Sequence, residues 1–307
     1  MAAILSVLAP IEITPSMLVS SSVPENDYVV WSAGASYGLG VRVISTGTHK
    51  VYESAQANNT NHDPTDIVNR AGAAIWWIEV SATNRWNMFD SQISTQTSSA
   101  SPLTVVLKTS SINSVYLVGL DADAITVTVK DATGGAVVFS FSAQLECSYP
   151  GDYYEYCFAP FKQQTDILIE NIPAYLAPEV SITLSKTSGN VKCGALQVGD
   201  LVPLGRTVAG AKPKPKSYSY IKVNDAGESE IKRRKSAKDL SVTALVALSE
   251  ADSVLETITS LLDVPCVWIA SASPQYSGAR AYGLGSADLS YEPGTHCILN
   301  LTVIGLI

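Results

Sequence analysis

Short apolar runs separated by turn residues dominate the middle of the chain. Gly, Asp, Asn and Pro punctuate runs of β-branched residues at 103–107, 114–120, 124–129, 136–141, 165–169 and 180–184. Short runs of this kind, separated by turn signals, are typical of strands in an antiparallel sandwich. Residues 131–135, Asp-Ala-Thr-Gly-Gly, have the composition of a hairpin turn between two of these strands. We therefore predict a β-sandwich over residues 98–204.

The pattern changes after residue 205. Residues 209–216 combine Gly, Lys and Pro and are typical of a loop or linker. A polar hairpin is then expected, because residues 217–222 and 230–235 flank the turn sequence at 224–227. The later apolar runs predict strands at 241–248, 266–270, 281–291 and 296–304.

One helix is predicted between these strands, over residues 249–263. Val254, Ile258, Leu261 and Leu262 recur at i, i+4, i+7 and i+8 and form one apolar stripe. Ser249 is a suitable N-cap, and Pro265 stops the helix. We expect residues 205–307 to form a β domain with this single helix covering a sheet.

Aromatic residues are concentrated near the N-terminus. Four of the five tryptophans lie in the first 90 residues: Trp31, Trp76, Trp77 and Trp86. Neighbouring residues on a strand face opposite sides, so one of Trp76 and Trp77 should fill a core while the other faces outward. An outward ring suits a sugar or a protein partner equally well. A Ser/Thr/Gln run at 94–101 marks the end of this aromatic-rich β module, which we place at residues 1–97.

Composition indicates a folded protein, since 46% of the residues are hydrophobic and only 16% are charged. No apolar run approaches the roughly 20 residues that cross a bilayer, so we expect no membrane insertion. The apolar stretch at 2–9 has no preceding basic residue and is not interpreted as a signal peptide, which favours synthesis in the cytoplasm. Five cysteines without any C-x-x-C pair predict buried thiols rather than disulfides or a zinc site.

Charge is distributed unevenly along the chain. The net charge is −8, yet residues 205–240 hold 10 of the 20 basic residues and only four of the 28 acidic ones. The run Lys232 to Lys235 has no interleaved aromatic residue, and consecutive side chains on a strand alternate faces, so we expect no nucleic-acid binding. It is either a solvated edge strand or a basic arm that meets an acidic surface of another copy or partner. The candidate assembly residues are Lys222, Lys232, Arg233, Arg234, Lys235 and Lys238.

Motifs for catalysis are missing from the sequence. It contains no nucleophile elbow, phosphate-binding loop, zinc-protease helix or dinucleotide fingerprint. The only histidines are His49, His62 and His296, and none has a partner at metal-ligand spacing; a solvated turn is the interpretation favoured for His62-Asp63. Paired acids of a glycosidase type are not marked by any local motif. We expect no enzymatic activity, no cofactor and no metal.

Trp31 is followed by Tyr37-x-x-Gly40-x-x-Val43, then by Tyr52-Glu-Ser, by Pro64 and by the Trp76-Trp77 pair. In this order the residues resemble the small chitin-binding-type modules of bacterial chitinases. The resemblance covers residues 31–77 and implies that Trp31, Tyr52, Trp76 and Trp77 stack on sugar or fill a small core. Tyr37 is a further candidate for a glycan or interface contact. A longer, Asn-rich insertion between Tyr52 and Trp76 departs from the family pattern.

Three other stretches, at 77–90, 153–160 and 193–199, resemble tail proteins of tailed bacteriophages. The C-terminal sheet with one helix is similar to the ring-forming domain of tail-tube and distal-tail proteins. The resemblance implies a structural virion protein of the tail tip or baseplate that forms homo-oligomers, contacts other tail proteins and extends to host-surface glycans. The hairpin at 217–235 is then the element that reaches a neighbouring subunit. The alternative is a carbohydrate-binding adhesin or receptor-binding protein without a ring-forming role.

Overall fold

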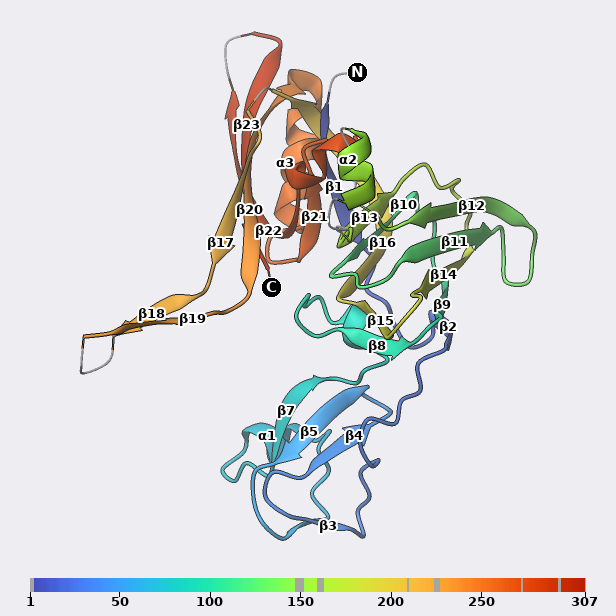
Figure 1. The fold of residues 1–307 in the computed structure, drawn as a ribbon, viewed down its shortest axis with the longest axis vertical. Helices are drawn as coiled ribbons and strands as arrows, with labels where there is room; N and C mark the ends of the chain where they lie inside the picture. The colour runs from blue at the N-terminus through green and yellow to red at the C-terminus, as the bar shows by residue number, and fades with distance from the viewer. Residues whose placement is uncertain are drawn as a thin grey trace.

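The computed structural model describes residues 3–146, 152–158, 163–208, 210–223, 227–271, 273–291 and 294–306. The fold is mainly β with several antiparallel sheets, as the sequence predicts. Figure 1 shows a sandwich and a long sheet side by side, a small N-terminal unit below them, and a narrow hairpin that projects away from the body.

A nine-stranded sheet forms the centre of the molecule. Its strand order is β13 (Asp166–Ile169), β10 (Ser114–Val118), β16 (Ala195–Thr207), β1 (Ile4–Pro10), β21 (Cys266–Ile269), β22 (Arg280–Tyr291), β23 (His296–Gly305), β20 (Ser236–Ala247), β17 (Lys212–Ser217). Strand β16 also pairs with β20, where Arg206 lies opposite Leu245. The strands from β16 to β20 therefore form a closed ring of hydrogen-bonded neighbours around an apolar core.

Strand β1 occupies an interior place in this sheet, between β16 and β21. Leu5, Val7 and Leu8 are fully buried because the strand is covered on both faces. The first strand therefore belongs to the main sheet rather than to the aromatic-rich unit in which the sequence placed it.

The predicted sandwich is present, and its six expected strands all form. The second sheet has the order β12 (Val137–Gln144), β11 (Ala124–Lys130), β14 (Glu179–Ser185), β9 (Leu103–Lys108), β2 (Leu18–Ser21). It packs on β13, β10 and β16 of the main sheet through one shared core. The predicted turn joins β11 to β12, and its Gly134 has a φ of 72°, which favours glycine.

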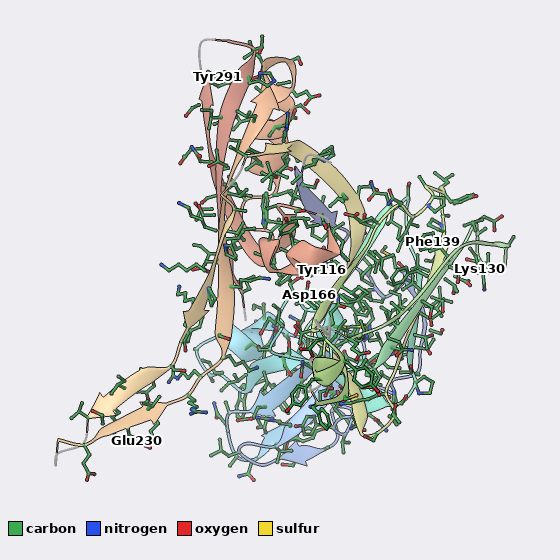
Figure 2. All side chains as sticks on the ribbon, turned by 45° about the horizontal axis from the view of Figure 1, so that its top comes forward. Tyr116, Lys130, Phe139, Asp166, Glu230 and Tyr291 are labelled. Carbon is green, nitrogen blue, oxygen red and sulfur yellow. The ribbon has the colours of Figure 1, made fainter. Side chains whose placement is uncertain are left out.

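Figure 2 labels Lys130 on the second sheet and Tyr116 and Asp166 on the main sheet. Lys130 donates to Glu179 over 2.6 Å across neighbouring strands of the second sheet. Tyr116 of β10 is buried on the other face of the main sheet, where it packs with Leu8 and Tyr282. Burial raises the pKa of Tyr116 well above its ordinary value, and the nearby Asp166 raises it further. Tyr116 therefore stays protonated and serves as core.

The N-terminal unit is built from short elements. They are β3 (Ser36–Tyr37), β4 (Arg42–Ser45), β5 (Lys50–Ser54), β6 (Asn59–Thr60), α1 (Ile67–Ala71), β7 (Trp77–Ala82), a 3-10 turn (Asn87–Phe89) and β8 (Thr97–Ala100). Strands β4, β5 and β7 form one sheet, and β3 pairs with β6. Strand β8 pairs with β15 (Asn190–Cys193), which connects this unit to the sandwich.

The C-terminal strands and the single long helix are where the sequence places them, but the start of the helix differs. A 3-10 turn (Leu248–Glu250) leads into α3 (Ala251–Ser260). Ser249 lies within that turn, and the N-cap position falls at Glu250 without a side-chain cap. The prediction of Ser249 as N-cap is wrong because the preceding 3-10 turn moves the N-cap by one residue, to Glu250.

The expected linker at 209–216 is wrong for most of its length. Residues Lys212–Ser217 form β17, which pairs with β20 at the edge of the main sheet. Two prolines, Pro213 and Pro215, are compatible with a strand here because an edge strand has one unpaired side, where a missing N–H costs no ladder hydrogen bond. The same prolines hinder the addition of a further strand at this edge.

Cys193, Cys266 and Cys297 are buried, which confirms the prediction for these thiols. Desolvation raises the pKa of both Cys193 and Cys266 to about 12. Cys157 differs, since it lies exposed on α2 (Tyr153–Phe158). Cys147 lies outside the described residues.

Candidate functional site

The predicted polar hairpin exists as an arm, defined here as residues 217–235, of which 217–223 and 227–235 are described. Strands β18 (Tyr220–Val223) and β19 (Ser229–Lys232) pair only with each other, and every residue in them is exposed. The arm continues the direction of β17 and β20 and projects from the body (Figure 1). Six residues separate the end of β17 from the end of β18, so the arm extends about 20 Å beyond the main sheet.

The two faces of the arm differ in chemistry because strand residues alternate sides. Ile221 lies directly opposite Ile231, and Val223 follows on the same face. These three side chains are 65%, 64% and 60% exposed. Sequence reasoning emphasised the charges and missed this apolar face, although the alternation Tyr-Ile-Lys-Val at 220–223 carries the signal.

The opposite face of the arm is aromatic and charged. The guanidinium carbon of Arg234 lies 4.8 Å from the centre of the Tyr220 ring, within the range of a cation–π contact. Lys232 forms an ion pair with Glu230, which Figure 2 labels near the far end of the arm. Lys222 is cross-strand to Glu230. This face keeps the arm soluble while the isoleucine face is left open.

Five of the six candidate assembly residues are exposed on or beside the arm: Lys222, Lys232, Arg233, Arg234 and Lys235. Lys235 also donates to the backbone oxygen of Ser94 over 3.2 Å. Lys238 departs from this placement, because it lies half-buried within β20, and desolvation lowers its pKa. Lys238 therefore belongs to the main sheet and is not a candidate assembly residue of the arm.

The aromatic candidates of the N-terminal unit divide into a core set and an outer set. Tyr37, Tyr52 and Trp77 are buried together with Val43 and form the core of this unit. Tyr37 meets Trp77 edge-on with ring centres 5.3 Å apart, and the indole N–H of Trp77 donates to the backbone oxygen of His62 over 2.7 Å. The ligand role considered for these three aromatics is wrong because their rings have no accessible face.

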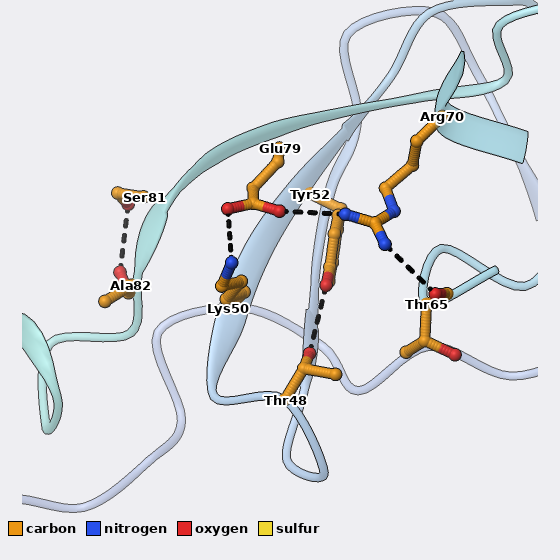
Figure 3. A network of polar contacts seen from close by, with 8 residues as sticks. All are labelled: Thr48, Lys50, Tyr52, Thr65, Arg70, Glu79, Ser81 and Ala82. Carbon is orange, nitrogen blue, oxygen red and sulfur yellow. Dashed lines mark hydrogen bonds and ion pairs between the residues drawn. The ribbon is translucent and has the colours of Figure 1, made fainter. Parts of the chain in front are cut away.

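A polar network covers Tyr52 from outside (Figure 3). Glu79 accepts from Lys50 over 2.5 Å and from Arg70 over 3.0 Å. The guanidinium carbon of Arg70 lies 5.9 Å from the centre of the Tyr52 ring, and Tyr52 Oη lies 3.0 Å from Thr48 Oγ1. Arg70 from α1 thus covers one side of the Tyr52 ring.

Trp31 and Trp76 are the outer set, since both rings are partly exposed at the edge of this core. His62 stacks on Trp76 with ring centres 3.7 Å apart and planes 11° from parallel. His62 Nδ1 lies 3.0 Å from Oδ1 of Asn59, which is fully buried. The His62-Asp63 segment is a partly exposed turn, and within it the His62 ring packs on Trp76. The predicted division of Trp76 and Trp77 between outside and inside is confirmed.

Short helix α2 carries a third exposed group that the sequence did not indicate as a contact surface. Tyr153, Tyr154 and Phe158 are 83%, 70% and 71% exposed. The Tyr154 and Phe158 rings lie one helical turn apart with centres 4.9 Å from each other.

Other classes of site are not seen in the described part of the chain. Within those residues, no group of three or more His, Cys, Asp or Glu side chains lies close enough to hold a metal ion. No helix among them is both long and apolar enough to span a membrane. No family model, curated protein or solved structure matches this chain.

Proposed function

We propose that this protein is a structural subunit that assembles with copies of itself through the arm, as a part of the tail tip or baseplate of a tailed bacteriophage. The observation that carries the proposal is the apolar face of the arm, Ile221, Val223 and Ile231, which stays open to solvent among the described residues. An isolated two-stranded hairpin is at best marginally stable in water. A neighbour that covers this apolar face would stabilise the arm.

The free energy expected from burying the apolar face of the arm supports a binding role. Burying a Val or Ile side chain contributes about 1.5–3 kcal/mol relative to leaving it exposed. Three such side chains on one short face concentrate this gain in a small contact. Part of it offsets the loss of rigid-body freedom on association. Repetition of the contact around a symmetric assembly supplies the rest.

Charge favours the same pairing. Residues 205–240 carry ten basic and four acidic residues, a net charge of +6. Because the whole chain carries −8, the remainder carries −14. A basic arm and an acidic body attract each other between copies, and this attraction accelerates association and fixes the register of the contact. Salt should weaken it.

The tail assignment rests on sequence resemblance. The stretches at 77–90, 153–160 and 193–199 carry it, together with the order of units expected from the sequence. Other tail proteins are the proposed heterologous partners, and the exposed aromatics of α2 offer a surface for one of them. The proposed location is the virion tail.

Deleting residues 218–234 should convert an oligomer into a monomer. The matched point variant is Ile221→Ser with Ile231→Ser, which keeps the charges of the arm and removes its apolar face. Val137→Ser is the control, since Val137 is a comparably exposed residue, 57%, on edge strand β12. Light scattering at low and moderate salt measures the mass of each. If the arm-deleted chain keeps the mass of the full chain, the arm is not an assembly device and the proposal fails.

Contact with host-surface glycans is a second candidate function, favoured by the partly exposed rings of Trp31 and Trp76. Aromatic faces at a rigid edge suit stacking on sugar rings, and His62 already fixes one of them. Titration with soluble chitin oligosaccharides should change the tryptophan fluorescence, and Trp76→Ala should weaken the binding by about tenfold, or roughly 1.4 kcal/mol. Trp86→Phe is the control because Trp86 is buried elsewhere in the unit. An unchanged signal in the unmodified chain would reject this candidate.

A further inference from the structure

Three half-exposed leucines lie along α3 and the residues that flank it. Leu248 lies in the preceding 3-10 turn, Leu255 within α3 and Leu262 just after its last residue; they are spaced by seven residues and are 49%, 43% and 47% exposed. The neighbouring side of the helix holds it to the body through the buried residues Ala251, Val254, Ile258 and Leu261. Leu255 lies one turn from Ala251, at the solvent edge of this buried stripe.

Acidic residues border these leucines. Asp252 and Glu256 are exposed on the neighbouring stripe of the helix, Asp263 is exposed in the turn that follows it, and residues 248–263 contain no Lys or Arg. The hydroxyl of Tyr291 donates to Asp252 over 3.0 Å and extends the surface from the end of β22. We define the helix surface as the three leucines together with Asp252, Glu256 and Asp263.

The arm complements the helix surface in hydrophobicity and in charge. Its isoleucine face offers apolar side chains, and Arg233 follows Ile231 by two residues, while Lys222 and Lys232 carry positive charge on the opposite face of the same two-stranded hairpin. Ile221 and Val223 are about 7 Å apart along the strand. A hairpin that lies along the helix therefore brings its apolar face against the leucines and places a basic arm beside an acidic stripe.

The arm cannot reach the helix surface of its own chain without folding back. Strand β20 has 12 residues and joins the two elements: the arm precedes it and the 3-10 turn and α3 follow it. Its length separates them by about 40 Å. Figure 2 shows the same separation, with Glu230 at the end of the arm and Tyr291, the partner of Asp252, at the far end of the long sheet. The helix surface must be met from another copy.

We infer that the arm of one copy docks on the helix surface of a second copy, isoleucine face against the three leucines. This inference rests on the proposed function and names the acceptor of its arm. Donor and acceptor are different patches at opposite ends of the molecule, so the contact is head-to-tail. Such contacts close into a ring if the rotation between copies allows it and otherwise propagate as a filament.

A charge exchange tests the contact. Asp252→Lys with Glu256→Lys should weaken self-association by roughly tenfold or more at low salt, because it places like charges against the arm. Lys222→Glu with Arg233→Glu should do the same, and the four substitutions together should restore association. The control is Asp200→Lys with Asp288→Lys, two exposed acids outside the helix surface. Light scattering gives the mass, and circular dichroism establishes that each variant is folded. Leu255→Ser is a second variant that leaves every charge in place and should also weaken association.

The outcomes separate the two proposals. If arm deletion gives a monomer while the helix variants keep the full mass, the helix surface is not the acceptor and only this inference is overturned. Weaker association of both folded double variants is the expected result. If combining the four substitutions then fails to restore association, direct contact between the arm and the helix surface is overturned. If arm deletion leaves the mass unchanged, the proposed function itself fails.

Discussion

Replacing Trp268 with alanine should lower the free energy of unfolding by about 3–5 kcal/mol. Trp268 is fully buried in β21, within the core enclosed by the ring of strands from β16 to β20. Its indole N–H donates to the backbone oxygen of Gly283 over 3.2 Å. The substitution removes the largest side chain of this core and leaves both a cavity and an unpaired carbonyl, each of which is destabilising.

Gly285 leaves space for the indole ring of Trp268. A Cβ atom at position 285 would lie 2.2 Å from Cζ2 of Trp268, which is far inside van der Waals contact. Gly285→Ala should therefore cost about 1–3 kcal/mol by overpacking in the unmodified core. In the Trp268→Ala background the same methyl group enters the cavity, so its cost should vanish or change sign.

The double-mutant cycle measures this coupling by urea denaturation followed through the far-UV signal. A coupling energy of about 1–3 kcal/mol is expected, with the two single variants more damaging in sum than the double variant. The control is Gly134→Ala, which is strained by its φ of 72° but has open space at Cβ and no neighbour in the core. Additive effects of Trp268→Ala and Gly285→Ala would show that the strand relaxes and that the contact does not set the packing.

Local pattern was enough to find most strands but not to assign them to sheets. The run at 114–118 and the run at 124–130 look alike in sequence, yet β10 joins the main sheet and β11 joins the second sheet. Pairing of β1 with β16 links Ser6 to Pro203. Such contacts depend on the packing of the whole core, which alternation along one segment does not encode.

The sequence likewise predicted the arm only in part. The position and the charge of the arm follow from the turn at 224–227 and the basic residues around it. Its projection from the body does not, because that depends on β17 pairing with β20 in spite of Pro213 and Pro215. The exposure of the leucines in the helix surface was also hidden: Leu262 fits the apolar stripe of the helix in sequence but is 47% exposed, since the helix ends at Ser260.

The pair Trp76 and Trp77 shows the limit most directly. Alternation on a strand requires that the two rings point to opposite sides, and the structure agrees. Which of the two points inward depends on the register of β7 against β5, where Trp77 lies opposite Ser54. The chitin-module resemblance gave both rings the same candidate roles, and only packing separates them.

That separation predicts unequal effects of two adjacent substitutions. Trp77→Ala should destabilise the N-terminal unit by about 3–5 kcal/mol, because it empties the centre of a core that contains only Tyr37, Val43 and Tyr52 besides it. Trp76→Ala should cost about 0.5–1.5 kcal/mol, the loss of a stacked ring pair at the surface. The main sheet has its own core and should stay folded in both variants.

Hydrogen exchange is the suitable measurement, because one midpoint of unfolding is not well defined for a chain with several cores. In Trp77→Ala the amides of β4, β5 and β7 should lose protection by a factor of at least about 100, while those of β20, β22 and β23 keep theirs. In Trp76→Ala both sets should be nearly unchanged. If Trp76→Ala removed protection from β4, β5 and β7 as fully as Trp77→Ala, the Trp76 ring would be a core element held by His62, and its loss could no longer be used to test for glycan contact. Unequal effects would instead leave Trp76 free for a ligand on a unit that folds without it.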